Sequence, residues 1–112
     1  MGVGVVLIEW IYGESGMGKT RLARQIASQT PNVVMLDGDD MRKVWTDLGF
    51  SDADRKTQNL RIARLARVLE LQGLNVIVAT ICADKELRAE VHRITNCKFI
   101  HIEANEDKKI WD

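Results

Sequence analysis

The strongest constraint on the fold is a glycine-rich octapeptide at residues 13–20. It reads GESGMGKT and is the one match in the chain to the pattern GxxxxGK[ST]. In this pattern, backbone N–H groups and the first turn of the following helix surround phosphate oxygens. The pattern requires a strand before it and a helix after it, and the flanking segments meet both conditions. We therefore predict a nucleotide-phosphate site formed by Gly13, Glu14, Ser15, Gly16, Met17, Gly18, Lys19 and Thr20.

Two side chains of the octapeptide carry its expected chemistry. Lys19 is placed to reach the outer phosphates of a nucleotide, so we predict a catalytic role for it. The Thr20 hydroxyl is an expected ligand of Mg²⁺, and ATP with Mg²⁺ is the predicted cofactor pair. The alternative is a glycine-rich turn that binds nothing. It is disfavoured because strand, motif and helix follow one another in the required order.

Apolar runs alternate with helical periodicity along the chain. The expected strands cover residues 3–12, 33–36, 75–81 and 98–102, and the expected helices cover residues 19–28, 41–48, 55–71 and 84–94. A further helix is expected to begin at Asn105. Strands that alternate with helices form right-handed βαβ units and a parallel sheet with helices on both faces. We predict one α/β domain over residues 1–112, with a P-loop-type parallel sheet of about four strands in the order 2-3-1-4. Ligands bind such sheets at the carboxyl ends of the strands.

Composition and charge argue against several kinds of partner. The chain has 16 basic and 16 acidic residues, and this balance argues against a nucleic-acid partner. The longest apolar run, residues 3–8, is too short to span a bilayer, so no membrane partner is expected. Cys82 and Cys97 match no metal-binding or CxxC spacing and indicate thiols in a reducing compartment. We predict a cytoplasmic location.

Two carboxylates follow the second expected strand. Asp37 and Asp39 are expected to face the phosphate loop from a neighbouring strand end, as a base for a substrate hydroxyl and as a partner of Mg²⁺. The residues do not decide which of the two is the base, and Asp39 is also the predicted metal partner of Thr20. The alternative is turn chemistry, with Asp39 or Asp40 capping the next helix. The strand at 75–81 ends without a carboxylate, which points away from motor and GTPase-type proteins towards small kinases.

Two longer segments resemble the adenylylsulfate kinase family. Residues 36–42 read LDGDDMR and are similar to the family's LDGDNxR, and residues 47–55 read DLGFSDADR and are similar to its DLGFSxxDR. The resemblance runs from about residue 5 to residue 102, with the motifs in the family's order. Members of this family use MgATP to phosphorylate the ribose 3′-hydroxyl of adenosine 5′-phosphosulfate. The resemblance implies the same reaction here, on a small-molecule nucleotide acceptor.

The resemblance also implies roles for individual residues. Asp37 and Asp39 are expected near the accepting hydroxyl and the Mg²⁺, Arg42 and Arg55 on the phosphosulfate, and Phe50 on the adenine. Read without the family, two arginines still suit an anion, because each offers a fork of N–H donors. Without the family, however, the favoured interpretations are a solvated helix face for Arg42 and a core position for Phe50.

Several departures from the family pattern surround the acceptor side. Asp40 replaces an asparagine, and the stretch from Asp39 to Phe50 is one residue shorter than in the family. Gln58 occupies the position of the family's asparagine and is expected in the acceptor site, while Cys82 replaces a serine. These changes leave two alternatives open. One is a kinase for a different nucleotide or sugar acceptor, and the other is a non-catalytic ATP-binding module or fragment.

The chain is also short for the family. It ends where the family's lid and last strand are expected to begin, so we expect a C-terminally short member without them. The fourth strand is then a sheet edge, and an unpaired edge favours pairing with another chain. We expect a homo-oligomer through that edge, and slow phosphate transfer because no lid excludes water.

Overall fold

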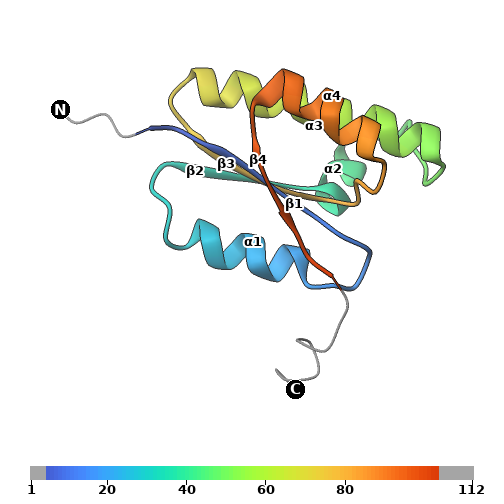
Figure 1. Cartoon of the computed structure of the whole chain (residues 1–112), viewed down its shortest axis with the longest axis horizontal. Coiled ribbons are helices and arrows are strands. Elements are labelled where there is room, and N and C mark those ends of the chain that lie inside the picture. The colour runs from blue at the N-terminus through green and yellow to red at the C-terminus, as the bar shows by residue number, and fades with distance from the viewer. Residues whose placement is uncertain (1–4, 104–112) are drawn as a thin grey trace.

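The computed structural model describes residues 5–103 of the chain. Within this range the elements follow the order β1 (Ile8–Tyr12), α1 (Lys19–Ala27), β2 (Val33–Asp37), α2 (Gly38–Val44), α3 (Asp52–Leu71), β3 (Asn75–Thr80), α4 (Lys85–Thr95) and β4 (Lys98–His101). The strands form one parallel sheet in the order β2-β3-β1-β4. Helix α1 covers one face of the sheet, and α3 and α4 cover the other (Figure 1). The predicted fold class and strand order are confirmed.

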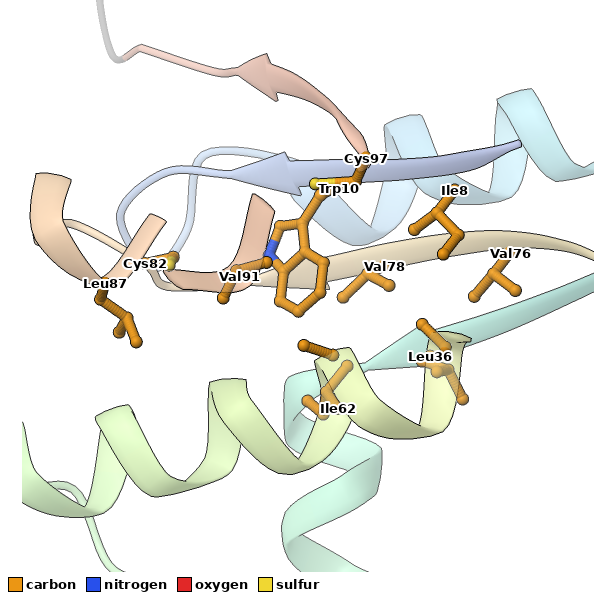
Figure 2. Packing of buried hydrophobic residues seen from close by; sticks show 12 residues of the cluster. Ile8, Trp10, Leu36, Ile62, Val76, Val78, Cys82, Leu87, Val91 and Cys97 are labelled. Carbon is orange, nitrogen blue, oxygen red and sulfur yellow. The ribbon is translucent and has the colours of Figure 1, made fainter. Parts of the chain in front are cut away.

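The side chains of the sheet alternate between two core layers. Ile77 and Ala79 of β3 face α1 and pack with its Ala23. Val76 and Val78 of the same strand face the opposite way, into the larger cluster under α3 and α4. Figure 2 shows this larger cluster, with Trp10 of β1 projecting towards the helix that carries Ile62. Burial on both faces explains why β1 and β3 read as continuous apolar runs rather than as alternating ones.

The predicted element bounds need three corrections. The first strand begins at Ile8, not at residue 3, and residues 5–7 are irregular. The second helix covers Gly38–Val44 instead of 41–48, because the Asp37 side chain accepts a hydrogen bond from the Asp39 amide and starts the helix directly after β2. The third helix begins at Asp52, three residues earlier than predicted, because the Ser51 hydroxyl accepts from the Asp54 amide.

The alternative interpretation of the acidic turn, a helix cap by Asp39 or Asp40, names the wrong residue. Asp37, rather than Asp39 or Asp40, caps α2. A helix predicted to begin at Asn105 lies outside the described residues. Within residues 5–103, no helix is long and apolar enough to cross a membrane.

Candidate functional site

The octapeptide forms a loop between β1 and α1 whose glycines adopt conformations that other residues rarely reach. Gly16 and Gly18 have φ values of 82° and 89°, in the left-handed region that favours glycine. A Cβ on Gly13 would lie 2.5 Å from the Ile102 carbonyl oxygen, so the backbone after β4 packs directly against the loop. Helix α1 has Gly18 as its N-cap and receives no side-chain cap. The positive end of this helix is therefore presented to a ligand rather than to a carboxylate of the chain.

Lys19 folds back onto its own loop. Its Nζ donates to the Glu14 carbonyl oxygen at 2.9 Å. Burial lowers the pKa of the Lys19 amine from its usual value, and so does nearby Arg55, while Asp39 and Asp37 act in the opposite direction. Desolvation disfavours the charged form, so phosphate oxygens near this amine would relieve an existing penalty. The Glu14 side chain is exposed, as expected for an acidic residue in an anion-binding loop.

Asp37 contacts the phosphate loop across an intervening strand. It ends β2, and β3 lies between β2 and β1, so the expectation of a neighbouring strand is wrong. The contact forms nevertheless, because the Thr20 hydroxyl donates to Asp37 Oδ2 at 2.5 Å. Asp37 Oδ1 accepts from the Asp39 amide at 2.9 Å, and the residue is only 6% exposed. Asp37 is thus a fixed carboxylate joined to the loop.

Asp39 has the opposite environment. Its side chain is 86% exposed, and its carboxylate lies 3.4 Å from Arg42 Nη1. Exposed pairs at this distance hold their partners weakly. The sequence does not decide which of these two carboxylates is the base, but their environments differ clearly. Asp37 is held by two hydrogen bonds, whereas the exposed Asp39 side chain is accessible to a ligand.

Arg42 and Phe50 form a stacked pair, which contradicts the interpretations favoured without the family. The Arg42 guanidinium lies 4.5 Å from the centroid of the Phe50 ring, a cation–π arrangement. The Arg42 side chain is only 15% exposed, so it is not on a solvated face. Its Nε is buried without a hydrogen-bond partner among the described residues. Phe50 is 68% exposed and is not in the core.

The segment that carries Phe50 is held onto α3 by polar contacts. Asp47 accepts two hydrogen bonds from Arg61 of α3, at 2.9 and 2.7 Å. The Gly49 amide donates to Asp54 Oδ2 at 2.9 Å, and Arg55 Nε donates to the Phe50 carbonyl at 3.0 Å. These contacts fix the backbone of the segment, which leaves the aromatic ring of Phe50 exposed.

Gln58 is buried and bonded to the acidic turn. Its Nε2 donates to the Gly38 carbonyl oxygen at 2.7 Å, and the residue is 3% exposed. The amide therefore ties α3 to the turn between Asp37 and Asp39. No local pattern indicates this contact, because the partner of Gln58 is a backbone atom 20 residues away.

Two cavities meet at the carboxyl end of β3. The first, of about 490 Å³, adjoins the phosphate loop and is lined by residues that include Lys19, Thr20, Asp37, Asp39, Arg42 and Gln58. The second, of about 720 Å³, is lined by residues that include Phe50, Arg55, Ile81 and Cys82. Ile81 lines both. Most of the predicted site residues line one of these two adjoining cavities, whereas Gly13, Glu14 and Met17 line neither. Arg21 and Arg24 line the first cavity although the sequence analysis did not select them.

Cys82 is buried beside the second cavity. It is 2% exposed, and burial raises the pKa of its thiol to about 12, although Arg88 acts in the opposite direction. Burial also raises the pKa of the Cys97 thiol. A protonated, enclosed thiol is a poor nucleophile.

We expect neither cysteine to react with iodoacetamide in the folded chain at pH 8, because both thiols are buried and protonated there. Mass spectrometry should show both modified after unfolding in guanidinium. Cys82→Ser should keep the ATP affinity of the unmodified chain within about threefold, since a thiol that stays buried and protonated takes no part in the chemistry of the site. Rapid labelling of folded Cys82, or loss of ATP binding in Cys82→Ser, would contradict this view of the site.

The parallel α/β sheet, the glycine-rich loop and the Thr20–Asp37 contact together define a P-loop nucleotide-binding domain. The sequence profile described as "Adenylylsulphate kinase" matches residues 4–110. The chain belongs to the adenylylsulfate kinase family.

Individual relatives agree with this assignment. The chain is 37% identical over 109 residues to a probable adenylyl-sulfate kinase of Bacillus subtilis, a match that covers 93% of this chain and 52% of that protein. It spans about half the length of the curated relatives it matches. The APS kinase CysC of Mycobacterium tuberculosis, solved in complex with AMPPNP and APS, superimposes with a TM-score of 0.75 at 30% identity, over 96% of this chain and 68% of that one. A hexameric APS kinase from Thiobacillus denitrificans gives a TM-score of 0.75 at 29% identity, over 90% and 22%.

Proposed function

We propose that the chain is the nucleotide-binding part of an ATP-dependent kinase that phosphorylates the 3′-hydroxyl of adenosine 5′-phosphosulfate. The observation that carries the proposal is the pair of adjoining cavities at the end of β3, one at the phosphate loop and one beside Phe50 and Arg55. A phosphoryl transfer enzyme needs a donor site and an acceptor site in contact. Membership of the adenylylsulfate kinase family supports this choice of acceptor.

The first cavity is the proposed ATP phosphate site. The loop amides and the N-terminus of α1 would surround the phosphates, and Lys19 would leave the Glu14 carbonyl to contact the outer ones. This movement places a positive charge where negative charge develops in the transition state. Transfer to a bound hydroxyl in this way needs no phosphorylated enzyme, which agrees with the buried Cys82 thiol.

The oxygen atoms at Thr20 and Asp37 suit a magnesium ion. A hydroxyl and a carboxylate already lie in contact there, and Mg²⁺ prefers oxygen ligands. We propose that Thr20 holds the ion with Asp37 beside it, and that Asp39 is a further candidate ligand from across the cavity. When bound, Mg²⁺ would neutralise charge on the transferring phosphates.

Asp39 is the proposed base. It is the exposed carboxylate of the first cavity, and it stands next to Arg42, whose partner Phe50 borders the second. A positioned carboxylate can accept the proton of the attacking hydroxyl. We propose that Arg42 and Arg55 bind the anionic groups of the acceptor and that Phe50 stacks on its base. Gln58 would act on the acceptor through the turn that it holds.

An assay of ADP release with and without adenosine 5′-phosphosulfate tests the proposal. We expect acceptor-dependent ADP release and a 3′-phosphorylated product, with much slower release for a sugar or for adenosine 5′-phosphate. Equal rates with a different nucleotide or a sugar would show that the proposed acceptor is wrong, whereas the proposed kinase activity would stand. ATP binding without any acceptor-dependent release would support a non-catalytic binding module instead.

We also propose that copies of the chain associate through β4, in the cytoplasm. Among the described residues β4 pairs only with β1, so its other side offers unpaired backbone groups. The similar APS kinase from Thiobacillus denitrificans is a hexamer. The two free thiols suit a reducing compartment.

A further inference from the structure

A chain of buried hydrogen bonds joins β1, β3 and α3. The Trp10 Nε1 of β1 donates to the Thr80 hydroxyl at 2.9 Å, and that hydroxyl donates to Asn59 Oδ1 at 2.8 Å. Asn59 lies on α3, and its Nδ2 donates to the carbonyl oxygens of Arg55 at 2.8 Å and Ile81 at 3.1 Å. We call Trp10, Thr80 and Asn59 the buried relay.

The buried relay is shielded from water. Trp10, Thr80 and Asn59 are 0%, 4% and 2% exposed. Figure 2 shows the Trp10 side chain standing between β1 and the helix of Ile62, with its indole nitrogen inside the cluster. Every polar atom of the Asn59 side chain is used, as acceptor once and as donor twice. Breaking one link would leave unpaired polar atoms in an apolar environment, which is costly, so the geometry of the relay is rigidly specified.

The residues at the two ends of the relay lie next to the cavities and to the phosphate loop. Ile81, whose carbonyl Asn59 holds, is the residue that lines both cavities. Arg55, whose carbonyl it also holds, lines the second cavity. Trp10 lies three residues before Gly13, where the phosphate loop begins. The relay therefore runs from β1, which leads into the phosphate loop, to the backbone of Arg55 and Ile81. We call this backbone the wall between the proposed ATP and acceptor cavities.

We propose that Asn59 is a positioning residue that fixes this wall, with Thr80 linking it to the strand of the phosphate loop. The inference rests on the proposed division of the cavities between ATP and the acceptor. Asn59 orients the backbone of Arg55 and Ile81, whereas the phosphate loop has its own support from Asp37 and Thr20. Thr80 itself lines the first cavity, so only a substitution that keeps its shape leaves the ATP site undisturbed. Loss of the Thr80 hydroxyl alone therefore disturbs the acceptor cavity more than the ATP site.

A matched pair of substitutions at Thr80 tests the relay. Thr80→Val keeps the shape of the side chain but removes the hydroxyl, whereas Thr80→Ser keeps the hydroxyl. We expect Thr80→Val to raise the KM for the acceptor about tenfold, with the KM for ATP changed less than about threefold. Thr80→Ser should stay within about threefold for both. Asn59→Asp, which keeps the oxygen facing Thr80 but replaces the donors to Arg55 and Ile81, should repeat the effect of Thr80→Val.

Thr95→Val is the matched control for a purely structural effect. Thr95 is 2% exposed, and its hydroxyl donates to the Val91 carbonyl and accepts from the Cys97 amide, so its loss also breaks buried hydrogen bonds. It lines neither cavity. We expect Thr95→Val to lower the melting temperature, but not to raise the KM for the acceptor more than the KM for ATP. If Thr80→Val behaves in the same way as Thr95→Val, the positioning role is wrong.

Hydrogen exchange gives a readout that does not need turnover. In Thr80→Val, amide exchange should become about tenfold faster in residues 50–58 and 81–84, but not in residues 13–20. Thr95→Val should leave both segments unchanged. A wild-type chain that fails to phosphorylate adenosine 5′-phosphosulfate would overturn only the proposed function. The exchange pattern would still show whether the relay positions residues 50–58 and 81–84. Uniform exchange across the three segments in Thr80→Val would overturn the relay itself.

Discussion

Replacing Lys19 with alanine is expected to lower kinase turnover by about 10²-fold or more, because it removes a positive charge aimed at the transferring phosphoryl group. The amine is already partly desolvated, as its lowered pKa indicates, so its charge acts in a medium that screens it less than water does. ATP affinity should fall as well, since the same amine contacts the outer phosphates. Steady-state ADP release and calorimetry with a non-hydrolysable ATP analogue measure the two effects.

Lys85→Ala is the control for removal of one lysine charge. Lys85 is exposed at the start of α4 and lines neither cavity. We expect Lys85→Ala to keep the turnover and the nucleotide affinity of the unmodified chain. Unchanged ATP affinity together with unchanged turnover in Lys19→Ala would contradict the assignment of the phosphate loop.

The fold was predictable because its main signals are local. The octapeptide specifies a strand–loop–helix order by itself, and the largely apolar β1 and β3 predict a sheet covered on both faces. The bounds of α2 were not predictable in the same way. Its start depends on the Asp37 side chain bonding to the Asp39 amide, and the same sequence also fits a cap by Asp39 or Asp40.

The arrangement of the candidate site could not be read from the sequence. Most of the residues named from the sequence line one of two adjoining cavities, but the roles proposed for Asp37 and Asp39 separate only through tertiary contacts. Thr20 reaches Asp37 across 17 residues, and Gln58 reaches Gly38 across 20. The buried relay gave no local signal at all, because Trp10 and Thr80 are 70 residues apart and each also fits an ordinary core position.

Dependence on contacts between distant parts of the chain also explains why the interpretations of Arg42 and Phe50 made without the family are wrong. A residue on a short helix and an aromatic in a loop have common local interpretations, as solvated face and as core. Both fail here because the segment from Asp47 to Arg55 is held onto α3, so that Arg42 and Phe50 meet each other instead. The family resemblance instead predicts both residues at a site, and each lines a cavity, Arg42 the first and Phe50 the second.

Substitution of the two carboxylates should give two different defects. In Asp39→Asn we expect the rate of acceptor phosphorylation to fall by about 10²–10⁴-fold, the usual cost of losing a general base. The KM for ATP should change little. The stability to urea should stay within about 0.5 kcal/mol, because the Asp39 side chain is 86% exposed and its pair with Arg42 is a surface contact. Rapid-quench measurement of product formation separates this loss in the chemical step from a loss of binding.

Asp37→Ala should act mainly on folding and on MgATP. It removes the cap of α2, which typically costs about 0.5–2 kcal/mol, and it removes the carboxylate that accepts the Thr20 hydrogen bond. Asp37→Asn keeps an acceptor for the Asp39 amide and should recover most of the stability. It should still weaken MgATP binding, because the charge beside Thr20 is lost.

Asp40→Asn is the matched control for both variants. Asp40 is adjacent in sequence, its side chain is 69% exposed, and it pairs with Lys43 rather than with a residue of the cavity. We expect Asp40→Asn to keep the turnover, the KM for ATP and the stability of the unmodified chain. If Asp39→Asn matches Asp40→Asn in turnover, Asp39 is not the base. If Asp37→Asn then shows the 10²–10⁴-fold loss with normal MgATP affinity, the two roles are reversed, and the fixed carboxylate beside Thr20 is the one that takes the proton.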